Sequence, residues 1–318
     1  MNIVGTGSYL PSHIVSNDDL ASIVDTTDEW IMERTGIKER RLSNGEENTE
    51  LAAKAASKAL QDAQVSPEEI DLIIVASATS EYLTPSMACI LAYKLGIPNA
   101  IAFDINAACS GFLYALNTAY GYLEAGMAET ALIVGSETLS KIVDYTDRGT
   151  CILFGDGAGA VIIQKGDNKL FASSAGSDGT RHDVIQCMHR PLSNLVVSKE
   201  NKIDYLHMNG QEVYKFVVSK IPEVIKNVVE KAELQLGDIK YFILHQANKR
   251  INEIVAKKLG IDFELFPCNL HKTGNTSAAS IGILLDEMNK SGRLTRGDKI
   301  VLCAFGAGMT WATIVLEW

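Results

Sequence analysis

Short apolar runs alternate along the chain with longer segments of helical, amphipathic period. The runs at 70–76 and 239–245 indicate buried strands, and each follows a helical stretch, at 49–63 and at about 210–232. Strands that alternate with helices are typical of a parallel sheet covered by helices. We expect Pro222 to interrupt or bend the second helix. The pattern predicts an α/β protein.

The second half of the chain repeats the order of the first. Residues 130–135 resemble residues 299–304, and residues 154–161 resemble residues 305–312. The same strand and the same glycine-rich strand opening therefore occur twice. A single long repeat indicates a duplicated fold with a pseudo-twofold axis, because solenoids repeat every ~20–50 residues.

A polar and irregular region at 165–205 separates the two copies. We therefore predict an N-terminal half, residues 1–165, and a C-terminal half, residues 166–318. Within the region, residues 181–204 form an excursion that could cover a site, and its role is left open.

Composition and charge exclude several classes of protein. Lysine and arginine total 29 against 39 acidic residues, a formal charge of −10, whereas a dedicated nucleic-acid or anionic-membrane binder needs a basic surplus. No run approaches the ~18 apolar residues of a membrane span, and residues 1–7 do not form a signal peptide. The six cysteines are scattered without a C-x-x-C pair, as free thiols in a reducing compartment are. We expect a cytoplasmic protein with no nucleic-acid or membrane partner.

Cys109 follows an apolar strand at 101–105 and precedes an apolar helix. A cysteine at the N-terminus of a helix lies where the dipole and the free amides stabilise a thiolate. Its small neighbours would let a substrate reach the sulfur. Taken alone, however, a lone cysteine in an α/β protein is more often a packed structural residue.

Two polar segments of the second half complement this cysteine. His245 closes the strand at 241–244, and ligands of α/β sheets gather at the carboxyl ends of strands. Asn275 occupies the repeat position of the Cys109 turn. Alone, His245 fits a structural histidine and Asn275 fits a helix N-cap equally well. A twofold axis, however, would bring Cys109 and Asn275 together, which favours a Cys-His-Asn site.

Two other patterns carry less chemistry. The glycine-rich segment 155–159 runs into a strand instead of a helix, so it fails the dinucleotide fingerprint and indicates a close backbone crossing. His182, Cys187 and His189 lack the spacing of metal ligands, so we expect no metal site.

These residues together resemble the thiolase-fold condensing enzymes, and within them the β-ketoacyl-[acyl-carrier-protein] synthase III family. The resemblance covers essentially the whole chain. It rests on residues 27–31 with 34–37, 107–112, 147–150, 245–248, 274–280 and 305–311. Elongating synthases are longer and use a Cys-His-His set, and thiolases carry a second cysteine in the C-terminal loop, where this chain has Ala307.

The resemblance implies a duplicated α-β-α-β-α fold, a homodimer and ping-pong chemistry. Cys109 would take an acyl group from acyl-CoA, and malonyl-acyl carrier protein (malonyl-ACP) would then lose CO2 and attack that group to give 3-oxoacyl-ACP. His245 and Asn275 would hydrogen-bond the malonyl thioester, and the backbone amides of Cys109 and Ala307 would form the oxyanion hole for the acyl carbonyl. The family usually has glycine where this chain has Ala307, but a backbone donor survives that change.

The family's substrate contacts can be carried over residue by residue. No cofactor is implied, since acyl-CoA is a substrate. Trp30 and Arg148 match the pair that sandwiches the CoA adenine. The other matching CoA contacts are Thr26, Arg34, Gly210 and Asn248.

Two further surfaces depend on the resemblance. The acyl pocket would be lined by Thr84, Met87 and Phe154, with Thr84 reaching the partner subunit, and these residues predict tolerance of primers longer than acetyl. A basic helix face, which a solvated surface explains equally well, would dock the acidic carrier protein through Lys215, Lys249, Arg250, Lys257 and Lys258.

Three alternatives remain. A priming synthase or acyltransferase of a polyketide or other specialised pathway shares the fold but usually alters the Asn or CoA-binding positions. A non-catalytic scaffold of the chain-length-factor kind loses the nucleophile, and Cys109 is present. A CoA-binding module without turnover would show adenine contacts alone.

Overall fold

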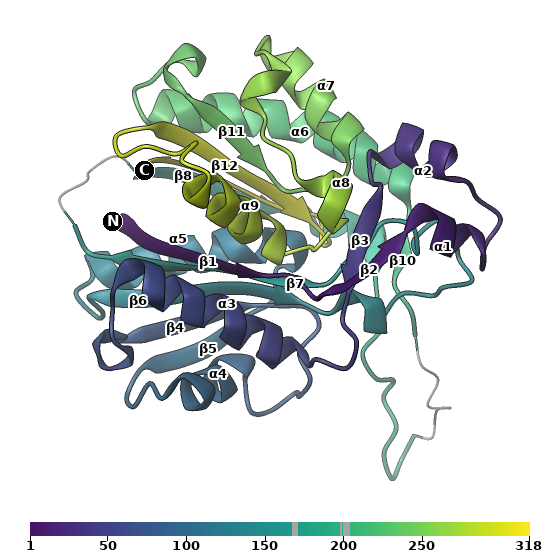
Figure 1. The fold of residues 1–318 in the computed structure, drawn as a ribbon, viewed down its shortest axis with the longest axis horizontal. Coiled ribbons are helices and arrows are strands. Elements are labelled where there is room, and N and C mark those ends of the chain that lie inside the picture. The colour runs from purple at the N-terminus through teal and green to yellow at the C-terminus, as the bar shows by residue number, and fades with distance from the viewer. Residues whose placement is uncertain (167–170, 198, 200–203) are drawn as a thin grey trace.

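The structure is a computed structural model that describes residues 1–166, 171–197, 199 and 204–318. Two sheets form its framework (Figure 1). The first has the strand order β1 (Asn2–Tyr9), β7 (Gly157–Gln164), β6 (Thr130–Glu137), β4 (Leu72–Ala76) and β5 (Ile101–Ile105). The second has the order β11 (Tyr241–Leu244), β12 (Lys299–Gly306), β13 (Thr310–Glu317) and β8 (Phe171–Ser177).

The repeat in the sequence corresponds to equivalent strands. In the first sheet β4 runs parallel to β6, which is antiparallel to β7. In the second sheet β11 runs parallel to β12, which is antiparallel to β13. The predicted division between residues 165 and 166 falls in the connection between β7 and β8 and stays a prediction, because residues 167–170 lie outside the described residues.

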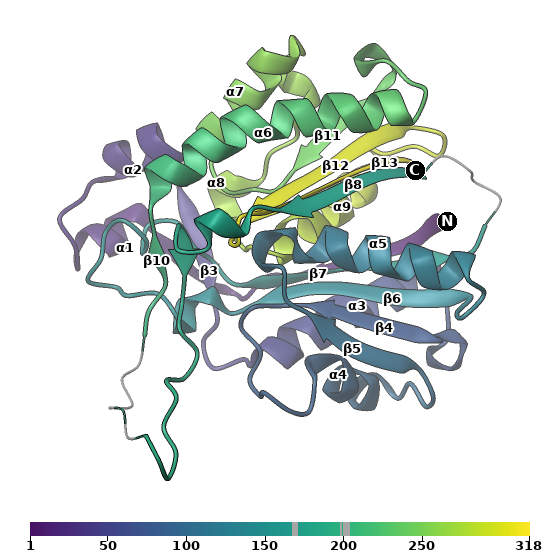
Figure 2. The same ribbon diagram turned by 180° about the vertical axis from the view of Figure 1, so that it is seen from behind.

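Helices cover and separate the sheets in five layers, α-β-α-β-α (Figures 1 and 2). The middle layer is α5 (Gly111–Glu124) and α9 (Ala279–Lys290), which share one core with both sheets. The outer layers are α3 (Asn48–Ala63) and α4 (Met87–Leu95) on the first sheet, and α6 (Gly210–Lys231) and α7 (Lys249–Leu259) on the second. The predicted α/β fold is therefore confirmed. In the part of the chain that the structure describes, no helix has the length and apolarity needed to cross a membrane.

Helix α6 contains Pro222, and strand β7 packs closely against α9. Helix α6 runs without interruption through Pro222, because burial of one apolar face holds the helix together. The predicted interruption is therefore wrong, and the alternative of a bend stays a prediction. The close backbone crossing predicted for the glycine-rich segment is confirmed. A Cβ at Gly159 would lie 2.4 Å from the carbonyl carbon of Gly282, so β7 and α9 pack backbone to backbone.

A small cap lies at one end of the sheets, at the carboxyl ends of β4 and β11. It consists of β2 (His13–Ser16), α1 (Asn17–Ala21), α2 (Asp28–Thr35), β3 (Glu39–Leu42) and α8 (Leu270–Thr273). Arg40 is buried in it and donates to the carbonyls of Val15 and Ile152 and to Asn17 Oδ1, which fixes the cap to the loop before β7. Strands β9 (Ile185–Gln186) and β10 (His207–Met208) pair with each other, and described residues that follow β9 project from the body (Figure 1).

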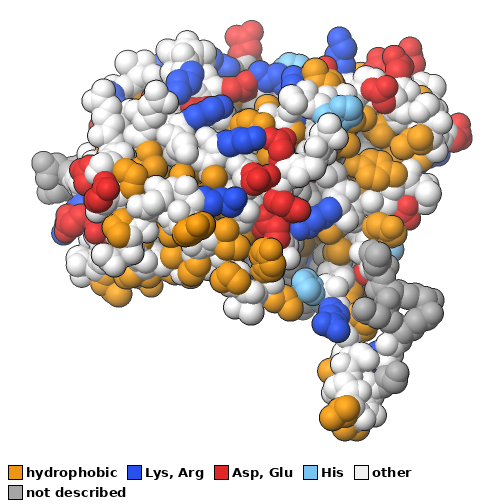
Figure 3. All heavy atoms as spheres, turned by 60° about the horizontal axis from the view of Figure 1, so that its bottom comes forward, with side chains coloured by type: hydrophobic (Ala, Val, Ile, Leu, Met, Phe, Trp, Pro, Cys, Tyr) orange, Lys and Arg blue, Asp and Glu red, His pale blue; other side chains and the backbone are white. Residues whose placement is uncertain are grey.

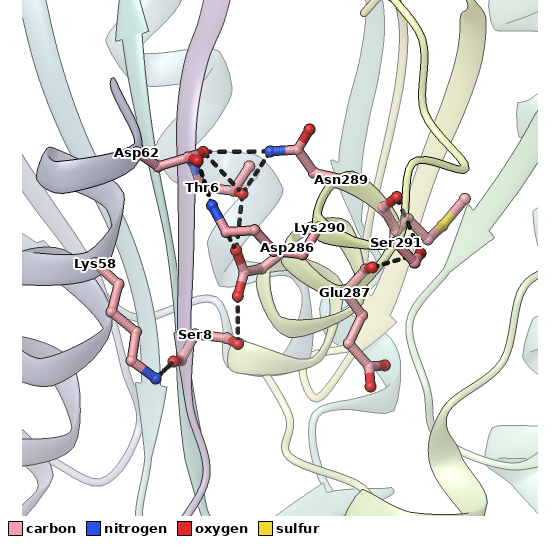
Figure 4. A network of polar contacts seen from close by, with 10 residues as sticks. Thr6, Ser8, Lys58, Asp62, Asp286, Glu287, Asn289, Lys290 and Ser291 are labelled. Atoms are coloured by element: carbon pink, nitrogen blue, oxygen red, sulfur yellow. Dashed lines mark hydrogen bonds and ion pairs between the residues drawn. The ribbon is translucent and has the colours of Figure 1, made fainter. Parts of the chain in front are cut away.

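A buried polar network joins β1 to the middle layer (Figure 4). The hydroxyls of Thr6 and Ser8 donate to the two oxygens of Asp286, over 2.8 Å and 2.6 Å. Asn289 Nδ2 donates to Thr6 Oγ1 over 3.0 Å, and Lys290 pairs with Asp62 of α3. Because buried polar groups need partners, this network fixes the position of α9 against both β1 and α3.

Candidate active site

A cavity of about 970 Å³ opens at the carboxyl ends of β4, β5 and β11, beside the cap. Residues from both halves line it. The cavity is lined by all four residues predicted to take part in chemistry, which are Cys109, His245, Asn275 and Ala307. Three of the residues predicted to bind substrate line it too, namely Phe154, Gly210 and Asn248.

Cys109 lies in a short turn, η2 (Ala108–Ser110), between β5 and α5. Ala108 has a φ of 47°, which turns the chain sharply before the helix. The end of β12 approaches this turn so closely that a Cβ at Gly306 would lie 2.7 Å from the Cys109 nitrogen. Only glycine leaves room for the nucleophile at this position.

Two features of the Cys109 surroundings shift the pKa of its thiol in opposite directions. Burial raises the pKa of the thiol to about 11, although a hydrogen bond with Ser277 acts in the opposite direction. Desolvation of the charged form is the larger of these two effects. The expectation that the helix N-terminus stabilises a thiolate stays a prediction.

His245 follows β11 directly and is 1% exposed. Burial lowers the pKa of its imidazole to about 3, so the ring is neutral at physiological pH. Its Nδ1 lies 2.7 Å from Ser280 Oγ, which also accepts the backbone N–H of Gln246. We assign the tautomer in which Nδ1 accepts from the Ser280 hydroxyl, so that the other ring nitrogen, Nε2, carries the proton and is an N–H donor.

Asn275 presents a donor to the same cavity. Its Oδ1 accepts the N–H of Ser277 over 2.8 Å, so the free group of the amide is Nδ2. Its backbone pairs with the loop before β7, because Asn275 N–H donates to Leu153 and its carbonyl accepts from Gly155. Helix α9 begins at Ala279 and its N-cap is Ala278, so the alternative that Asn275 caps this helix is wrong.

Ala307 lies in the tight turn between β12 and β13. Thr310 joins this turn to the cysteine turn, because its hydroxyl lies 3.0 Å from the Ala307 carbonyl, 3.2 Å from the Ala107 carbonyl and 3.1 Å from Ser110 Oγ. Ser280 and Thr310 both lie within quoted motifs, but the sequence carried no signal for their roles. Each role depends on a contact between segments far apart in the chain.

The residues predicted to hold the CoA nucleotide lie at the cap. The guanidinium carbons of Arg34 and Arg148 lie 4.7 Å and 5.0 Å from the centre of the Trp30 indole. A ring between Trp30 and Arg148 would need a separation of about 7 Å, two van der Waals contacts, so Arg148 has to move for adenine to enter. Thr26, like these three, does not line the cavity.

Asn248 connects the cap to the cavity. It caps α7, donates its Nδ2 to the Arg34 carbonyl over 3.0 Å and lines the cavity, as Gly210 does. Phe154 also lines the cavity, whereas Thr84 is exposed on the surface and Met87 is 1% exposed beneath Asn48. In the single chain, therefore, only Phe154 of the three predicted pocket residues reaches the cavity.

The predicted basic surface lies on the outer layer of the second half. Lys249, Arg250, Lys257 and Lys258 are exposed on α7, whose first turn adjoins the cavity at Asn248. Lys215 is exposed on α6 and pairs with Glu212, and Lys249 pairs with Glu253, so two of the five charges are partly neutralised.

Comparisons with known proteins agree with this geometry. A family model described as 3-oxoacyl-[acyl-carrier-protein] synthase III matches residues 103–179, and a second model, for the C-terminal part of that family, matches residues 229–318. The β-ketoacyl-[acyl-carrier-protein] synthase III of Clostridium acetobutylicum is 52% identical over 100% of this chain and 98% of its own.

Solved structures extend the likeness. The 3-oxoacyl-[acyl-carrier-protein] synthase III from Aquifex aeolicus is 43% identical with a TM-score of 0.93, over 99% of each chain. A priming β-ketosynthase from the R1128 polyketide pathway is 34% identical with a TM-score of 0.91, over 99% of this chain and 95% of its own. The first likeness is thus the greater of these two. The chain belongs to the β-ketoacyl-[acyl-carrier-protein] synthase III family of condensing enzymes.

Proposed function

We propose that the protein starts fatty acid synthesis by condensing an acyl-CoA primer with malonyl-ACP. Cys109 attacks the primer thioester, CoA leaves, and an acyl-enzyme remains. Malonyl-ACP then loses CO2, and its carbanion attacks the acyl group to give 3-oxoacyl-ACP. The observation that carries this proposal is the single cavity that Cys109, His245, Asn275 and Ala307 all line.

The two steps use different donors. In acyl transfer, the backbone N–H groups of Cys109 and Ala307 stabilise the oxyanion of the acyl carbonyl. In condensation, His245 Nε2–H and Asn275 Nδ2 donate to the thioester carbonyl of the malonyl group, where the enolate develops. The lowered pKa of His245 supports this role, since a neutral imidazole donates a hydrogen bond through its N–H and does not have to change its protonation state first.

Acyl-CoA reaches the cysteine from the cap. Trp30 and Arg148 hold the adenine between an aromatic face and a planar cation. Arg34 and Thr26 contact the nucleotide, and Gly210 and Asn248 lie along the pantetheine arm. The hydrogen bond from Asn248 to the Arg34 carbonyl supports one continuous path from cap to sulfur. Acyl-CoA is a substrate here, and the reaction as proposed needs no resident cofactor.

The enzyme acts as a homodimer that forms through the edge of the first sheet. Strand β5 ends that sheet, so one of its sides has no strand partner within the described chain. Nearby Leu83 is 78% exposed and Tyr82 is 58% exposed, and apolar side chains gather on this face (Figure 3). A bare edge beside apolar surface favours pairing with a second copy. Thr84, next to Leu83, would then line the acyl pocket of that copy.

Carrier protein docks on α7. The exposed side chains of Lys249, Arg250, Lys257 and Lys258 form a local positive face on an otherwise acidic protein, which suits an acidic partner.

The enzyme works in the cytoplasm, and its six free cysteines support this location. The acyl pocket tolerates primers longer than acetyl, because Thr84 and Met87 are smaller or more flexible than an aromatic residue.

The test is intact-protein mass after mixing with acetyl-, isobutyryl- and longer acyl-CoAs. We expect a single acyl adduct on the wild type, no adduct on Cys109→Ser, and the same adduct on Cys89→Ser, which removes an exposed cysteine that does not line the cavity. Addition of malonyl-ACP should then discharge the adduct and yield 3-oxoacyl-ACP. A folded protein that forms no adduct with any CoA contradicts the proposal.

The polyketide reading is the second candidate, and the likeness to the R1128 priming ketosynthase supports it. The same experiment separates the two readings. Discharge by a specialised-pathway carrier protein at a rate at least tenfold above that by the carrier protein of fatty acid synthesis would favour the polyketide reading.

A further inference from the structure

One side-chain hydroxyl contacts both of the turns that carry the proposed oxyanion donors. Thr310 is the first residue of β13 and lines the cavity. Its Oγ1 lies 3.0 Å from the carbonyl oxygen of Ala307, 3.2 Å from that of Ala107 and 3.1 Å from the hydroxyl of Ser110. This hydroxyl therefore joins the turn after β12 to the turn that contains Cys109.

The single proton of the Thr310 hydroxyl limits which bonds can form. A carbonyl oxygen only accepts, so the carbonyls of Ala107 and Ala307 share that proton. Ser110 is 0% exposed, and Thr310 is the one hydrogen-bond partner of its hydroxyl among the residues that the structure describes. The arrangement that satisfies all of these groups has Ser110 donating to Thr310 Oγ1 and Thr310 donating to the two carbonyls.

The rest of the turn after β12 is fixed by other contacts. Gly306 pairs with Thr310 between β12 and β13, and it leaves no room for a Cβ against the cysteine turn. Met309 exchanges two backbone hydrogen bonds with Asp178, over 2.8 Å and 3.0 Å. Ala307 lies between these two fixed points, and the Thr310 hydroxyl contacts its carbonyl. The orientation of the Ala307 backbone therefore depends on Thr310.

Thr310 also holds the backbone on both sides of Cys109. It contacts the carbonyl of Ala107, two residues before the cysteine, and the hydroxyl of Ser110, the residue after it. The N–H groups of Cys109 and Ala307 thus belong to two segments that one hydroxyl holds together. Such a pair stabilises an oxyanion only when both N–H groups lie within hydrogen-bond distance of it at the same time.

We propose that Thr310 is the positioning residue that sets the spacing of the two oxyanion donors, and with it the rate at which Cys109 is acylated. This inference rests on the proposed function, in which the N–H groups of Cys109 and Ala307 stabilise the oxyanion of the acyl carbonyl. Thr310 acts through the two turns and takes no part in making or breaking bonds. Because the CoA nucleotide binds at the cap, the loss of Thr310 changes the rate of acylation and not the binding of acyl-CoA.

The test is the single-turnover rate of Cys109 acylation, measured by intact-protein mass over a range of acyl-CoA concentrations. Valine keeps the shape of threonine and removes the hydroxyl. In Thr310→Val the maximal rate should therefore fall about tenfold to 10²-fold, while the half-saturating concentration of acyl-CoA changes less than about threefold. Thr310→Ser restores the hydroxyl and should acylate at close to the wild-type rate.

Thr313→Val is the matched control for this substitution. Thr313 lies on the same strand, is 0% exposed and donates its hydroxyl to Cys303 Sγ over 3.1 Å. Neither of these two residues lines the cavity. The control variant should therefore keep the wild-type rate of acylation.

Alkylation by iodoacetamide, measured on the peptide that carries Cys109, separates misplaced donors from a generally disturbed cysteine. Displacement of iodide develops no oxyanion, so Thr310→Val should be alkylated within about threefold of the wild-type rate. The double variant Ser110→Ala, Thr310→Val removes the hydroxyl that the single variant leaves unpaired, and it should give the same two rates as Thr310→Val.

Normal acylation of folded Thr310→Val, or of the folded double variant, overturns the proposal. An equal fall in acylation and alkylation also overturns it, because a disturbed cysteine turn alone would give that result. A wild type that is alkylated but never acylated instead contradicts the proposed function.

Discussion

The two halves of the molecule use one backbone design for different chemistry. Cys109 and Ser277 occupy equivalent turns, each preceding an inner helix, and the turns contain the unusual φ values of 47° at Ala108 and 48° at Ser277. Strands β6 and β12 are also equivalent, and they end in Glu137 and Gly306. Each of these strand ends faces the turn of the other half. Two residues before Glu137, a Cβ at Gly135 would lie 2.3 Å from the Ala278 carbonyl oxygen, and Gly306 likewise leaves room for Cys109.

This difference shows how a duplicated fold acquires an active site. The first half supplies the group that is acylated, and the second half supplies the donors that act on the malonyl thioester. At the crossing positions the first half keeps a bulky acid and the second half keeps no side chain at all. The duplication therefore set the backbone geometry, and the chemistry arose where the two copies diverged.

The largest effect should come from removing the second half's donors. His245→Asn and Asn275→Ala should lower the rate of condensation by about 10²–10³-fold, as loss of an oxyanion donor does. Formation of the acyl adduct on Cys109 should change by less than about tenfold, because these donors act in the second step. Separate measurement of adduct formation and of its discharge by malonyl-ACP checks this. Equal losses of rate in acylation and in condensation would contradict the assignment of acylation to the first half and condensation to the second.

A smaller but still large effect is expected at Gly306. A methyl group there would lie 2.7 Å from the Cys109 nitrogen, so Gly306→Ala should displace the cysteine turn and slow acylation about 10²-fold. Gly121→Ala in α5 is the control, since a Cβ there meets nothing within 4 Å, and it should acylate normally. Normal acylation of folded Gly306→Ala would show that the Cys109 turn tolerates a side chain at the end of β12, as the equivalent turn tolerates Glu137 at the end of β6.

The two halves should also respond to pH in opposite directions. Glu137 has a pKa raised to about 7, so its contribution to the free energy of unfolding is lost as the pH rises from about 4.5 to 7. His245 has a pKa lowered to about 3, so its contribution is lost as the pH falls from about 6.5 to 3. Denaturant unfolding at pH 5 and pH 8 should therefore show Glu137→Gln gaining stability relative to the wild type at pH 8, on the order of 2 kcal/mol.

His245→Gln should gain relative to the wild type at the acidic end instead. Lys165, an exposed side chain remote from both groups, offers a neutral control through Lys165→Gln, which should leave the profile unchanged. Parallel profiles for the Glu137 and His245 variants would contradict the opposite environments of the two groups.

The smallest effect concerns the outer surface of the second half. Arg250→Glu reverses one charge on α7 and should raise the KM for malonyl-ACP about threefold to tenfold, because rim charges act mainly on encounter. The kinetics with acyl-CoA should stay unchanged. Lys94→Glu on α4 of the first half is the matched reversal and should alter neither substrate. An equal rise for both substrates would remove α7 as the docking face.

Much of the fold could be predicted because its signals are local or repeated. The apolar runs predicted β4 and β11 to within two residues, and the repeat predicted that β6 and β7 have counterparts in β12 and β13. Pro222 misled, since a single local rule was outweighed by the apolar face that α6 buries. Propensity is a weak guide wherever packing decides.

The candidate site divides in the same way. Cys109, His245 and Asn275 could be found because each stands at a strand end or turn that the repeat makes comparable. Ser280 and Glu137 could not, because the contact of Ser280 with His245 and the burial of Glu137 against Ser77, Ala78 and Thr79 arise only in the folded chain. The raised pKa of the Cys109 thiol could not be predicted for the same reason, since a position at the start of a helix does not tell how deeply the side chain is buried.

The backbone contact between β7 and α9 has a consequence for the synthesis of the chain. The ribosome completes the first half before the second, yet the inner face of β1 and β7 is covered by α9, which is made near the end. Until residues 279–290 emerge, that apolar face is uncovered and the hydroxyls of Thr6 and Ser8 lack Asp286, although Thr6 can still bond Asp62 of α3. The first half must therefore wait in an incomplete state, and the nascent chain should depend on chaperones or on fast completion during this interval.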